Sequence, residues 1–252
     1  MRFHPRRLFS AFFALILLCS AASAAEEAAR PPLSEEQLLS YYDGAVFIGD
    51  SITGQLHAYV LRQRQSDPDF MKNTKFYTAD SYFLYAASRK YLLNDVNNLT
   101  LRSVEMPLWE LVEVLQPKRV LILLGVNDYA GDQIEKNIGY CERILDLICP
   151  AAPDTQVIFE SLTPVRPAFC RRKDYRAMWD AYNAALEEMC LRRGAGYIDI
   201  AAALKDEDGY LRKEYCSDGE YHLSRAGVRV WLDSLIQYAQ TQYDLGLWEP
   251  QQ

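Results

Sequence analysis

Short apolar runs alternate with longer segments of helical spacing along this chain of 252 residues. The runs that have the length of a strand are Ala45–Ile48, Lys75–Thr78, Val120–Leu124, Gln156–Glu160 and Gly196–Ile200. Between them, apolar residues recur at intervals of three and four, which predicts helices over Gln133–Ile148, Tyr175–Arg193 and Ser224–Tyr243. A further helix is predicted over Leu99–Gln116, in which Pro107 marks a break or a new first turn.

Strands that alternate with helices usually pair in parallel and are joined by right-handed crossovers. The pattern therefore predicts one three-layer α/β/α domain built on a five-stranded parallel sheet, over residues 42–245. No internal repeat or second linker interrupts it. In such a sheet, ligands bind beyond the carboxyl ends of the strands, so the residues that follow each strand are the first place to look for chemistry.

Residues 1–24 have the pattern of a secretory signal peptide. Three arginines precede an uninterrupted apolar run over Ala11–Cys19, and Ala22-Ser23-Ala24 has the small-x-small pattern of a cleavage site. The run is too short for a membrane span, so no stable membrane insertion is expected after cleavage. A lipoprotein anchored at Cys19 is not favoured, because the large Leu18 precedes it. Residues 25–41 are then a linker and an N-terminal helix, and the protein is expected to be secreted or extracytoplasmic.

Charge and cysteine content narrow the function classes. The formal net charge is −7, and loss of the three leader arginines takes it to about −10. No basic cluster is dense enough to follow a phosphate backbone, which argues against a nucleic-acid partner. The five cysteines beyond the leader are scattered and have no C-x-x-C spacing, so neither a zinc site nor a disulfide framework is indicated. No metal or organic cofactor is implied.

A serine, an asparagine and a histidine lie at the expected sheet edge. Ser51 follows the first strand, Asn127 follows the third, and His222 precedes the last helix. A serine hydroxyl needs a neighbouring base to act as a nucleophile, and histidine titrates in the right range. His57 lies six residues beyond Ser51 in the same helix, which places it about 9 Å along the axis and on another face. His222 is therefore the only credible base beyond the leader.

Ser51 and Asn127 also have purely structural interpretations. Serine is typical of a helix cap, and asparagine is typical of the turn after a strand. As a functional residue, Asn127 would donate its amide N–H to the oxyanion of a tetrahedral intermediate. The backbone N–H of Ser51, at the start of a helix, would then be a second donor.

Taken together, these segments resemble the SGNH (GDSL-type) hydrolases. Gly49-Asp50-Ser51-Ile52 is similar to the first block of the family, in which the serine is the nucleophile. Gly125-Val126-Asn127-Asp128 resembles the third block, whose asparagine contributes to the oxyanion hole, and His222-Leu223-Ser224 resembles the fifth, which supplies the base. The blocks occur in family order, and the resemblance covers roughly residues 42–243. It implies a flavodoxin-like α/β/α fold and a serine hydrolase that acts on ester bonds.

The second block departs from the family pattern. The family has a glycine there whose N–H completes the oxyanion hole, whereas the stretch "FYTADSYFLYAAS" contains no glycine. A backbone donor does not require glycine, so we expect Ala79 or Ser81 to supply the N–H. Ser81 is slightly favoured, because it resembles the small polar replacements that fit at this place.

The fifth block also departs from the family pattern. The family spacing is Asp-x-x-His, but Gly219 stands three residues before His222 and Asp218 stands four before it. We expect Asp218 to reach the ring across a one-residue bulge and to orient it, which fixes the tautomer and stabilises the imidazolium. Glu220 or a backbone carbonyl could orient the ring instead, which would leave a Ser–His dyad.

Other residues near the blocks are candidates for positioning and substrate contact. Asp50 is expected to shape the turn before Ser51, and Asp128 to brace the Asn127 loop. The candidate substrate-contacting residues are Asp50, Gly125, Tyr82 and Trp109. Tyr82 and Trp109 are expected at the rim of the pocket, although aromatic residues more often belong to the core.

The sequence thus predicts an exported serine esterase that works through an acyl-enzyme on Ser51. The expected partner is a small-molecule or polysaccharide ester, such as an O-acetyl or short acyl group on a carbohydrate or cell-wall polymer. A lipid ester hydrolase, a thioester hydrolase and an O-acyltransferase would use the same residues. A catalytically weak carbohydrate-binding protein that keeps the fold is the alternative outside enzymes.

Overall fold

Five parallel strands form the central sheet of the computed structural model, which describes residues 30–250. The expected signal peptide at residues 1–24 lies outside the described residues. The strands are β1 (Ala45–Gly49), β2 (Lys75–Thr78), β5 (Arg119–Leu123), β6 (Gln156–Glu160) and β7 (Gly196–Ile198). Their order is β2-β1-β5-β6-β7, the flavodoxin-like order, so the prediction of a five-stranded parallel sheet is confirmed.

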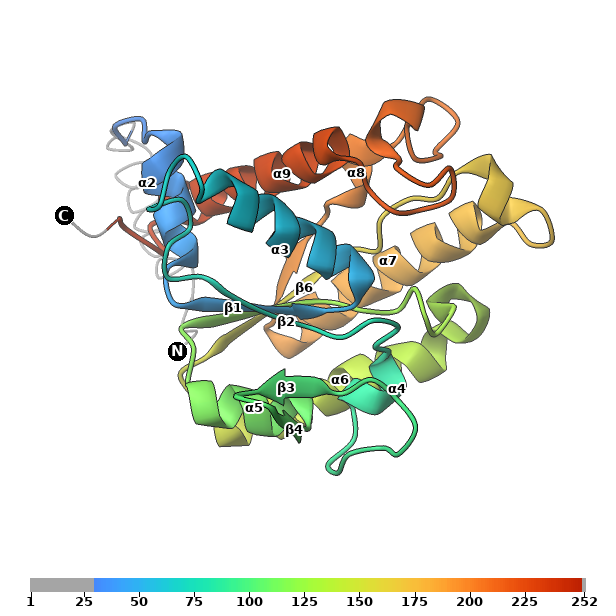
Figure 1. The fold of residues 1–252 in the computed structure, drawn as a ribbon, viewed down its shortest axis with the longest axis horizontal. Coiled ribbons are helices and arrows are strands. Elements are labelled where there is room, and N and C mark those ends of the chain that lie inside the picture. Colours follow the sequence, from blue (N-terminus) through green and yellow to red (C-terminus); the bar gives the residue numbers. More distant parts are fainter. Residues whose placement is uncertain (1–29, 251–252) are drawn as a thin grey trace, which may run out of the picture. The chain divides into compact units, whose positions relative to one another are not determined.

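Helices cover both faces of the sheet (Figure 1). On one face, α3 (Ser51–Gln63) packs against α9 (Arg225–Asp244), which also contacts α2 (Glu35–Leu39). On the other face lie α5 (Leu108–Leu115), α6 (Ile134–Ala151) and α7 (Tyr175–Arg193). The short elements are α4 (Leu84–Ala87), α8 (Ala201–Leu204) and the 3-10 turns η1 (Ser40–Tyr42), η2 (Ala130–Gln133), η3 (Pro167–Cys170) and η4 (Lys213–Tyr215).

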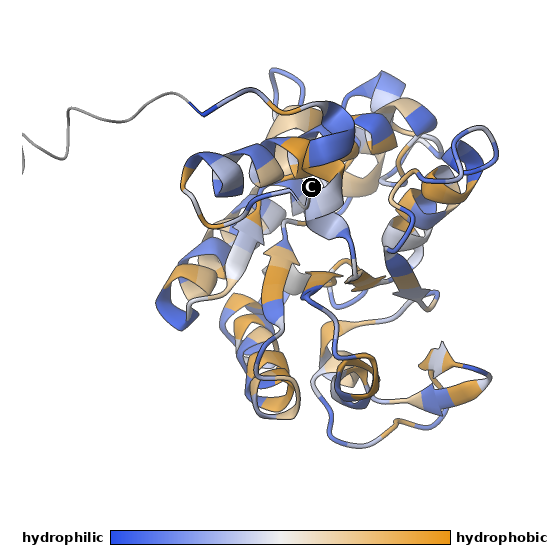
Figure 2. Ribbon diagram, turned by 90° about the vertical axis from the view of Figure 1, so that its left-hand side faces the viewer, coloured by the Kyte–Doolittle hydropathy of each residue, from blue (hydrophilic) through white to orange (hydrophobic). Residues whose placement is uncertain are grey.

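The core lies between these layers. Every residue of β1 is buried, as are the last four of β5 and of β6, because both faces of a parallel sheet are covered by helices. Figure 2 shows these hydrophobic strands in the centre, with helices around them that carry both hydrophobic and hydrophilic positions. No helix within residues 30–250 is both long and apolar enough to cross a membrane.

The predicted helix over Leu99–Gln116 is wrong in its first half. Residues 99–106 form the hairpin β3 (Leu99–Leu101) and β4 (Val104–Met106), and α5 begins only after Pro107. The two turn residues, Arg102 and Ser103, have φ angles of 51° and 67°. Hairpin turns of this kind usually contain Asn-Gly or Asp-Gly, so Arg-Ser gave no turn signal. The strand predicted to end at Ile200 also stops earlier, at Ile198.

Gly49 ends β1 at the point where the chain turns into α3. A Cβ atom here would lie 2.0 Å from Thr53 Oγ1 and 2.7 Å from the carbonyl oxygen of Leu123. No side chain fits in that space, so the glycine lets the first turn of α3 pack directly against the end of β5. Ser51 is thereby held at the carboxyl edge of the sheet.

Candidate active site

Ser51 is the first residue of α3. Asp50 caps this helix, because its Oδ1 accepts a hydrogen bond from the backbone N–H of Ile52 at 2.9 Å. The expectation that Asp50 shapes the turn is therefore confirmed. The N–H groups of the first helical turn have no partner within the helix and carry partial positive charge. The N–H of Ser51 therefore lies at a helix end that stabilises a nearby negative charge.

Ser51, His222 and Asp218 form a continuous chain of contacts. Ser51 Oγ lies 3.1 Å from His222 Nε2, and His222 Nδ1 lies 2.6 Å from Asp218 Oδ2. The carboxylate thus holds one ring nitrogen and turns the other toward the hydroxyl, which is the arrangement that a serine nucleophile and its base require. No other side chain of the described residues is within hydrogen-bond distance of the ring nitrogens of His222.

The loop around Asp218 accommodates the extra residue before the histidine. Gly219 has a φ angle of +82°, which folds the chain back over the carboxylate. Asp218 Oδ1 accepts hydrogen bonds from the N–H groups of Glu220, Tyr221 and His222, at 2.8, 3.1 and 3.2 Å. Burial alone would raise the pKa of Asp218, but the N–H groups of Glu220 and Tyr221 and the side chains of His222 and Cys216 outweigh it and lower the pKa to about 2. Asp218 is therefore a carboxylate at any ordinary pH.

Gln55 connects α3, the helix that begins at Ser51, to residues 216–224, which carry His222 and which we call the histidine loop. Its Oε1 accepts a hydrogen bond of 2.9 Å from the N–H of Leu223, the residue after His222. Ser51 and Gln55 are one helical turn apart, so both lie on the face of α3 that meets this loop. Gln55 was not among the residues predicted from the sequence, although its i, i+4 spacing from Ser51 was a usable signal.

Asn127 lies beside Asp50 and the second-block loop. Its Nδ2 donates to Asp50 Oδ2 at 2.8 Å and to the carbonyl oxygen of Tyr82 at 3.1 Å. Burial raises the pKa of Asp50 to about 7, although the N–H of Ile52 and the nearby His222 act in the opposite direction. Both N–H groups of the amide therefore have protein acceptors, and an oxyanion would have to replace one of them.

In the second-block loop, the backbone N–H of Ser81 is a better candidate donor to the oxyanion than the N–H of Ala79. The N–H of Ala79 already donates to the carbonyl of Gly49 at 3.2 Å, so the prediction that Ala79 supplies a free donor is wrong. The N–H of Ser81 donates to none of the residues in the described part of the chain, and the residue is exposed. Its φ angle is 59°, in the left-handed region that a glycine normally occupies. Its role in an oxyanion hole stays a prediction.

Tyr82 and Trp109 do not lie at the rim of the site. Tyr82 is only 2% exposed, and its carbonyl accepts a hydrogen bond from Asn127. The Trp109 indole donates to the carbonyl of Lys90 and lies with the last turns of α6, at the amino-end side of the sheet. Trp109 is therefore placed away from Ser51, and the pocket-rim prediction is wrong for both aromatics.

The two remaining predicted residues shape loops. Gly125 has a φ angle of +131°, a conformation that an L side chain rarely adopts, so its place is explained by the turn after β5. Asp128 accepts hydrogen bonds from the N–H groups of Leu84 and Tyr85, at 2.7 and 3.3 Å. It thereby joins the Asn127 loop to the start of α4, which agrees with a bracing role.

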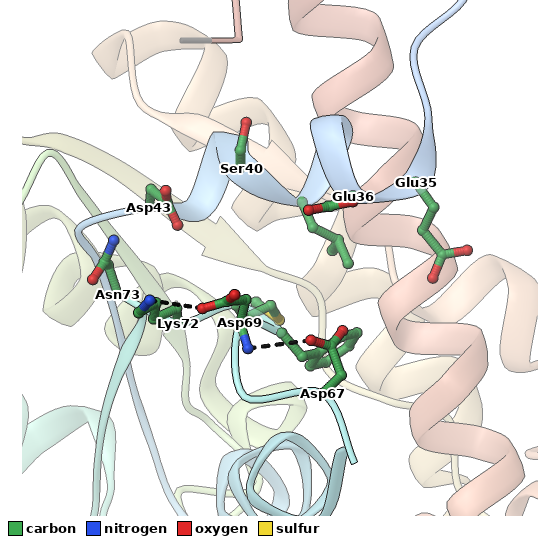
Figure 3. Close-up of a pocket in the computed structure, with 11 residues that line it drawn as sticks. Glu35, Glu36, Ser40, Asp43, Asp67, Asp69, Lys72 and Asn73 are labelled. Atoms are coloured by element: carbon green, nitrogen blue, oxygen red, sulfur yellow. Dashed lines mark hydrogen bonds and ion pairs between the residues drawn. The ribbon is translucent and has the colours of Figure 1, made fainter. Parts of the chain in front are cut away.

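A large hollow lies at the opposite end of β1 and β2 from this site. It has a volume of about 550 Å³ and is lined by α2, η1 and the loop before β2 (Figure 3). Five of its lining residues are acidic, namely Glu35, Glu36, Asp43, Asp67 and Asp69. None of the predicted site residues lines it. In the described part of the chain, no group of three His, Cys, Asp or Glu side chains is placed to hold a metal ion.

Comparisons with known proteins agree with this geometry. The model of the GDSL-like Lipase/Acylhydrolase family matches residues 47–230. A comparison with curated protein sequences gives no significant match.

Solved structures with the same fold include two bacterial proteins. A GDSL-like lipase from Bacteroides thetaiotaomicron has a TM-score of 0.59 and 18% identity, over 88% of this chain and 97% of its own. A catalytic mutant of an acetylxylan esterase from Geobacillus stearothermophilus has a TM-score of 0.54 and 15% identity, over 77% of this chain and 93% of its own. At such identities the likeness establishes the fold.

Proposed function

Because the chain belongs to the GDSL-like lipase/acylhydrolase family of ester-hydrolysing serine hydrolases, we propose that it is an exported esterase that removes short acyl groups from a carbohydrate. The observation that carries the proposal is the chain of contacts from Ser51 through His222 to Asp218, with distances of 3.1 and 2.6 Å. A structural neighbour that is an acetylxylan esterase supports the choice of acyl group and substrate class. Variants of that esterase with a replaced serine, aspartate or histidine are each catalytic mutants.

The reaction begins with the transfer of the Ser51 proton to His222 Nε2 as the Oγ attacks the ester carbonyl. Asp218 keeps the ring in the required tautomer and stabilises the imidazolium. His222 then gives the proton to the leaving alcohol, which departs and leaves the acyl group on Ser51. A water molecule, deprotonated by His222, releases the acid in the second half of the reaction.

The oxyanion that forms in each half is held by N–H donors at the sheet edge. The candidates are the backbone N–H groups of Ser51 and Ser81 and the amide of Asn127. The bond from Asn127 to the Tyr82 carbonyl is the longer of its two, at 3.1 Å, so it is the one that the oxyanion would replace. The bond to Asp50 meanwhile keeps the amide in place.

A covalent probe and an ester assay test this proposal. A fluorophosphonate should add once to the wild-type protein, and Ser51→Ala should abolish both the adduct and the release of acetate from acetylated xylan. A protein that neither reacts with the probe nor hydrolyses p-nitrophenyl acetate would contradict an esterase. Product analysis with an acceptor sugar present would reveal acyl transfer instead of hydrolysis.

Export is tested separately, with the full-length chain. We expect the protein in the extracytoplasmic fraction to begin at Ala25, the residue after the small-x-small pattern. Retention of an intact N-terminus in the cytoplasm would overturn this part of the proposal without affecting the chemistry.

A further inference from the structure

Four aromatic side chains join the loop after β5 to the histidine loop. We call Tyr129, Phe169, Tyr175 and Tyr221 the aromatic wall. Their ring centroids follow one another at 5.7 Å from Tyr129 to Tyr175, 4.9 Å from Tyr175 to Phe169, and 5.0 Å from Phe169 to Tyr221. Tyr129 is 47% exposed and the other three are half-buried, so the aromatic wall reaches the surface instead of belonging to the core.

The aromatic wall ends at the catalytic histidine. The ring of Tyr221 lies 4.4 Å from that of His222, centroid to centroid, at an interplanar angle of 31°. At its other end, Tyr129 is two residues beyond Asn127. The wall therefore runs alongside the place where the ester must sit, on the side of the histidine.

The chemistry of the reaction decides which part of the ester touches this side. His222 Nε2 protonates the leaving oxygen, so that oxygen comes within hydrogen-bond distance of the histidine. The alcohol part of the ester is therefore next to Tyr221, whereas the acyl oxygen faces the N–H donors at Ser51, Ser81 and Asn127. The aromatic wall contacts the alcohol and not the acyl group.

The aromatic wall combines flat apolar faces with free hydroxyl groups. No hydrogen bond joins the hydroxyls of Tyr129, Tyr175 and Tyr221 to another residue in the range 30–250. Phe169 and Tyr175 are supported from behind by the buried ring of Trp179. An aromatic ring with a polar tip suits a partner that has both an apolar face and a polar rim. A pyranose ring has this character, whereas an alkyl chain would leave the hydroxyl groups without a partner.

We propose that the aromatic wall is the subsite for the alcohol part of the ester and that its occupant is a pyranose ring. This proposal rests on the proposed esterase function and specifies its leaving group. Three segments carry the wall, namely the loop after β5, the segment of Phe169 and Tyr175, and the histidine loop, and polar contacts link the middle segment to each of the other two. Lys173 forms an ion pair with Asp132, and the N–H of Arg166 donates to the carbonyl of Glu220.

The test compares esters that share the acetyl group and differ in the alcohol. The substrates are an O-acetylated methyl xylopyranoside, ethyl acetate and octyl acetate. Tyr175→Ala should lower kcat/KM for the pyranoside by about five- to tenfold, as expected for loss of one aromatic contact, and leave ethyl acetate unchanged. Phe70→Ala is the matched control, since it removes an aromatic ring at the opposite end of the strands from Ser51. Equal losses on pyranoside and ethyl acetate, or a loss confined to octyl acetate, would overturn the proposal.

A binding measurement separates this proposal from the esterase proposal. The Ser51→Ala protein should bind the acetylated pyranoside in a titration followed by NMR, and adding Tyr175→Ala should weaken the binding by a similar factor. Binding that depends on Tyr175 in a protein whose wild type hydrolyses no ester would refute the esterase and keep the subsite. Turnover of esters without any effect of Tyr175 on pyranoside binding would refute the subsite alone.

Discussion

Replacing Asp218 by asparagine separates the orienting role of the carboxylate from its role in folding the loop. Asparagine keeps one oxygen, which can still accept the hydrogen bonds that Oδ1 receives from three backbone N–H groups. Its NH2 group, however, would face His222 Nδ1, where Oδ2 now lies at 2.6 Å. Nδ1 would then accept a hydrogen bond instead of donating one, so the ring proton would lie on Nε2. In that tautomer the histidine cannot take the proton of Ser51.

The expected loss of activity is large and the expected loss of stability is small. A wrong tautomer costs about 10³- to 10⁴-fold in kcat, or about 4 to 5.5 kcal/mol in the activation free energy. The lowering of the Asp218 pKa from 3.8 to about 2 corresponds to about 2 kcal/mol of folding free energy at face value. Its side chain is 33% exposed, so solvent screening reduces this to about 1 kcal/mol.

The assay is steady-state hydrolysis of p-nitrophenyl acetate, together with thermal unfolding of each variant. Glu220→Gln is the matched control, because Glu220 is the neighbouring acid that could have oriented the ring, and it should keep nearly all activity. Asp218→Ala should lose the activity and, in addition, more stability than asparagine, since three N–H groups lose their acceptor. If Asp218→Asn keeps more than a tenth of the wild-type kcat, the carboxylate does not orient His222.

Three further predictions follow from the contacts around the site and in the core. Asn127→Ala should lower kcat by about 10²- to 10³-fold with little change in KM, because one oxyanion donor is lost; an unchanged kcat would assign the amide to the turn alone. Gln55→Ala should lower kcat about three- to tenfold without moving the pKa values of the pH–rate profile, whereas Gln55→Glu should restore the acceptor for Leu223 and most of the activity. Burial raises the pKa of Glu160 from 4.5 to about 8, so the folded protein binds a proton that the unfolded chain releases in this range. The free energy of unfolding should therefore fall as pH rises from 4.5 to 8, by at most about 1.4 kcal/mol per pH unit, and Glu160→Gln should flatten this slope in urea titrations.

Local patterns predicted the sheet and the long helices, because a buried parallel strand and an amphipathic helix each have a signal within one window of sequence. The range predicted for α7, Tyr175–Arg193, matches the structure at both ends. The hairpin at residues 99–106 had no such signal, since its turn residues adopt positive φ angles without glycine or asparagine. A turn that tertiary packing forces on ordinary residues cannot be read from the residues themselves.

The residues of the site also divide into those with a local sequence signal and those without one. Ser51, Asn127 and His222 could be placed because each follows or precedes a recognisable element at the same edge of the sheet. Asp218 depended on a loop that brings together residues four apart, and the sequence left Glu220 open as an alternative. The prediction for the aromatic residues Tyr82 and Trp109 was wrong, because tertiary packing, which the local sequence does not show, decides whether a ring lies in the core or at the surface. Tyr82 is buried, whereas Tyr221 lies against the histidine.

Gly49 has a consequence for how variants of this protein should be interpreted. The space that a side chain at position 49 would need is already taken by Thr53 and by the carbonyl oxygen of Leu123. A random library would find no tolerated replacement at this position, and an inactive Gly49→Ala protein would look like the loss of a catalytic group. The intolerance would instead come from crowding, and Thr53→Ala in the same chain would partly relieve it by removing Thr53 Oγ1, the closest contact. Invariance at a glycine beside a nucleophile can thus measure the space available there and not the chemistry.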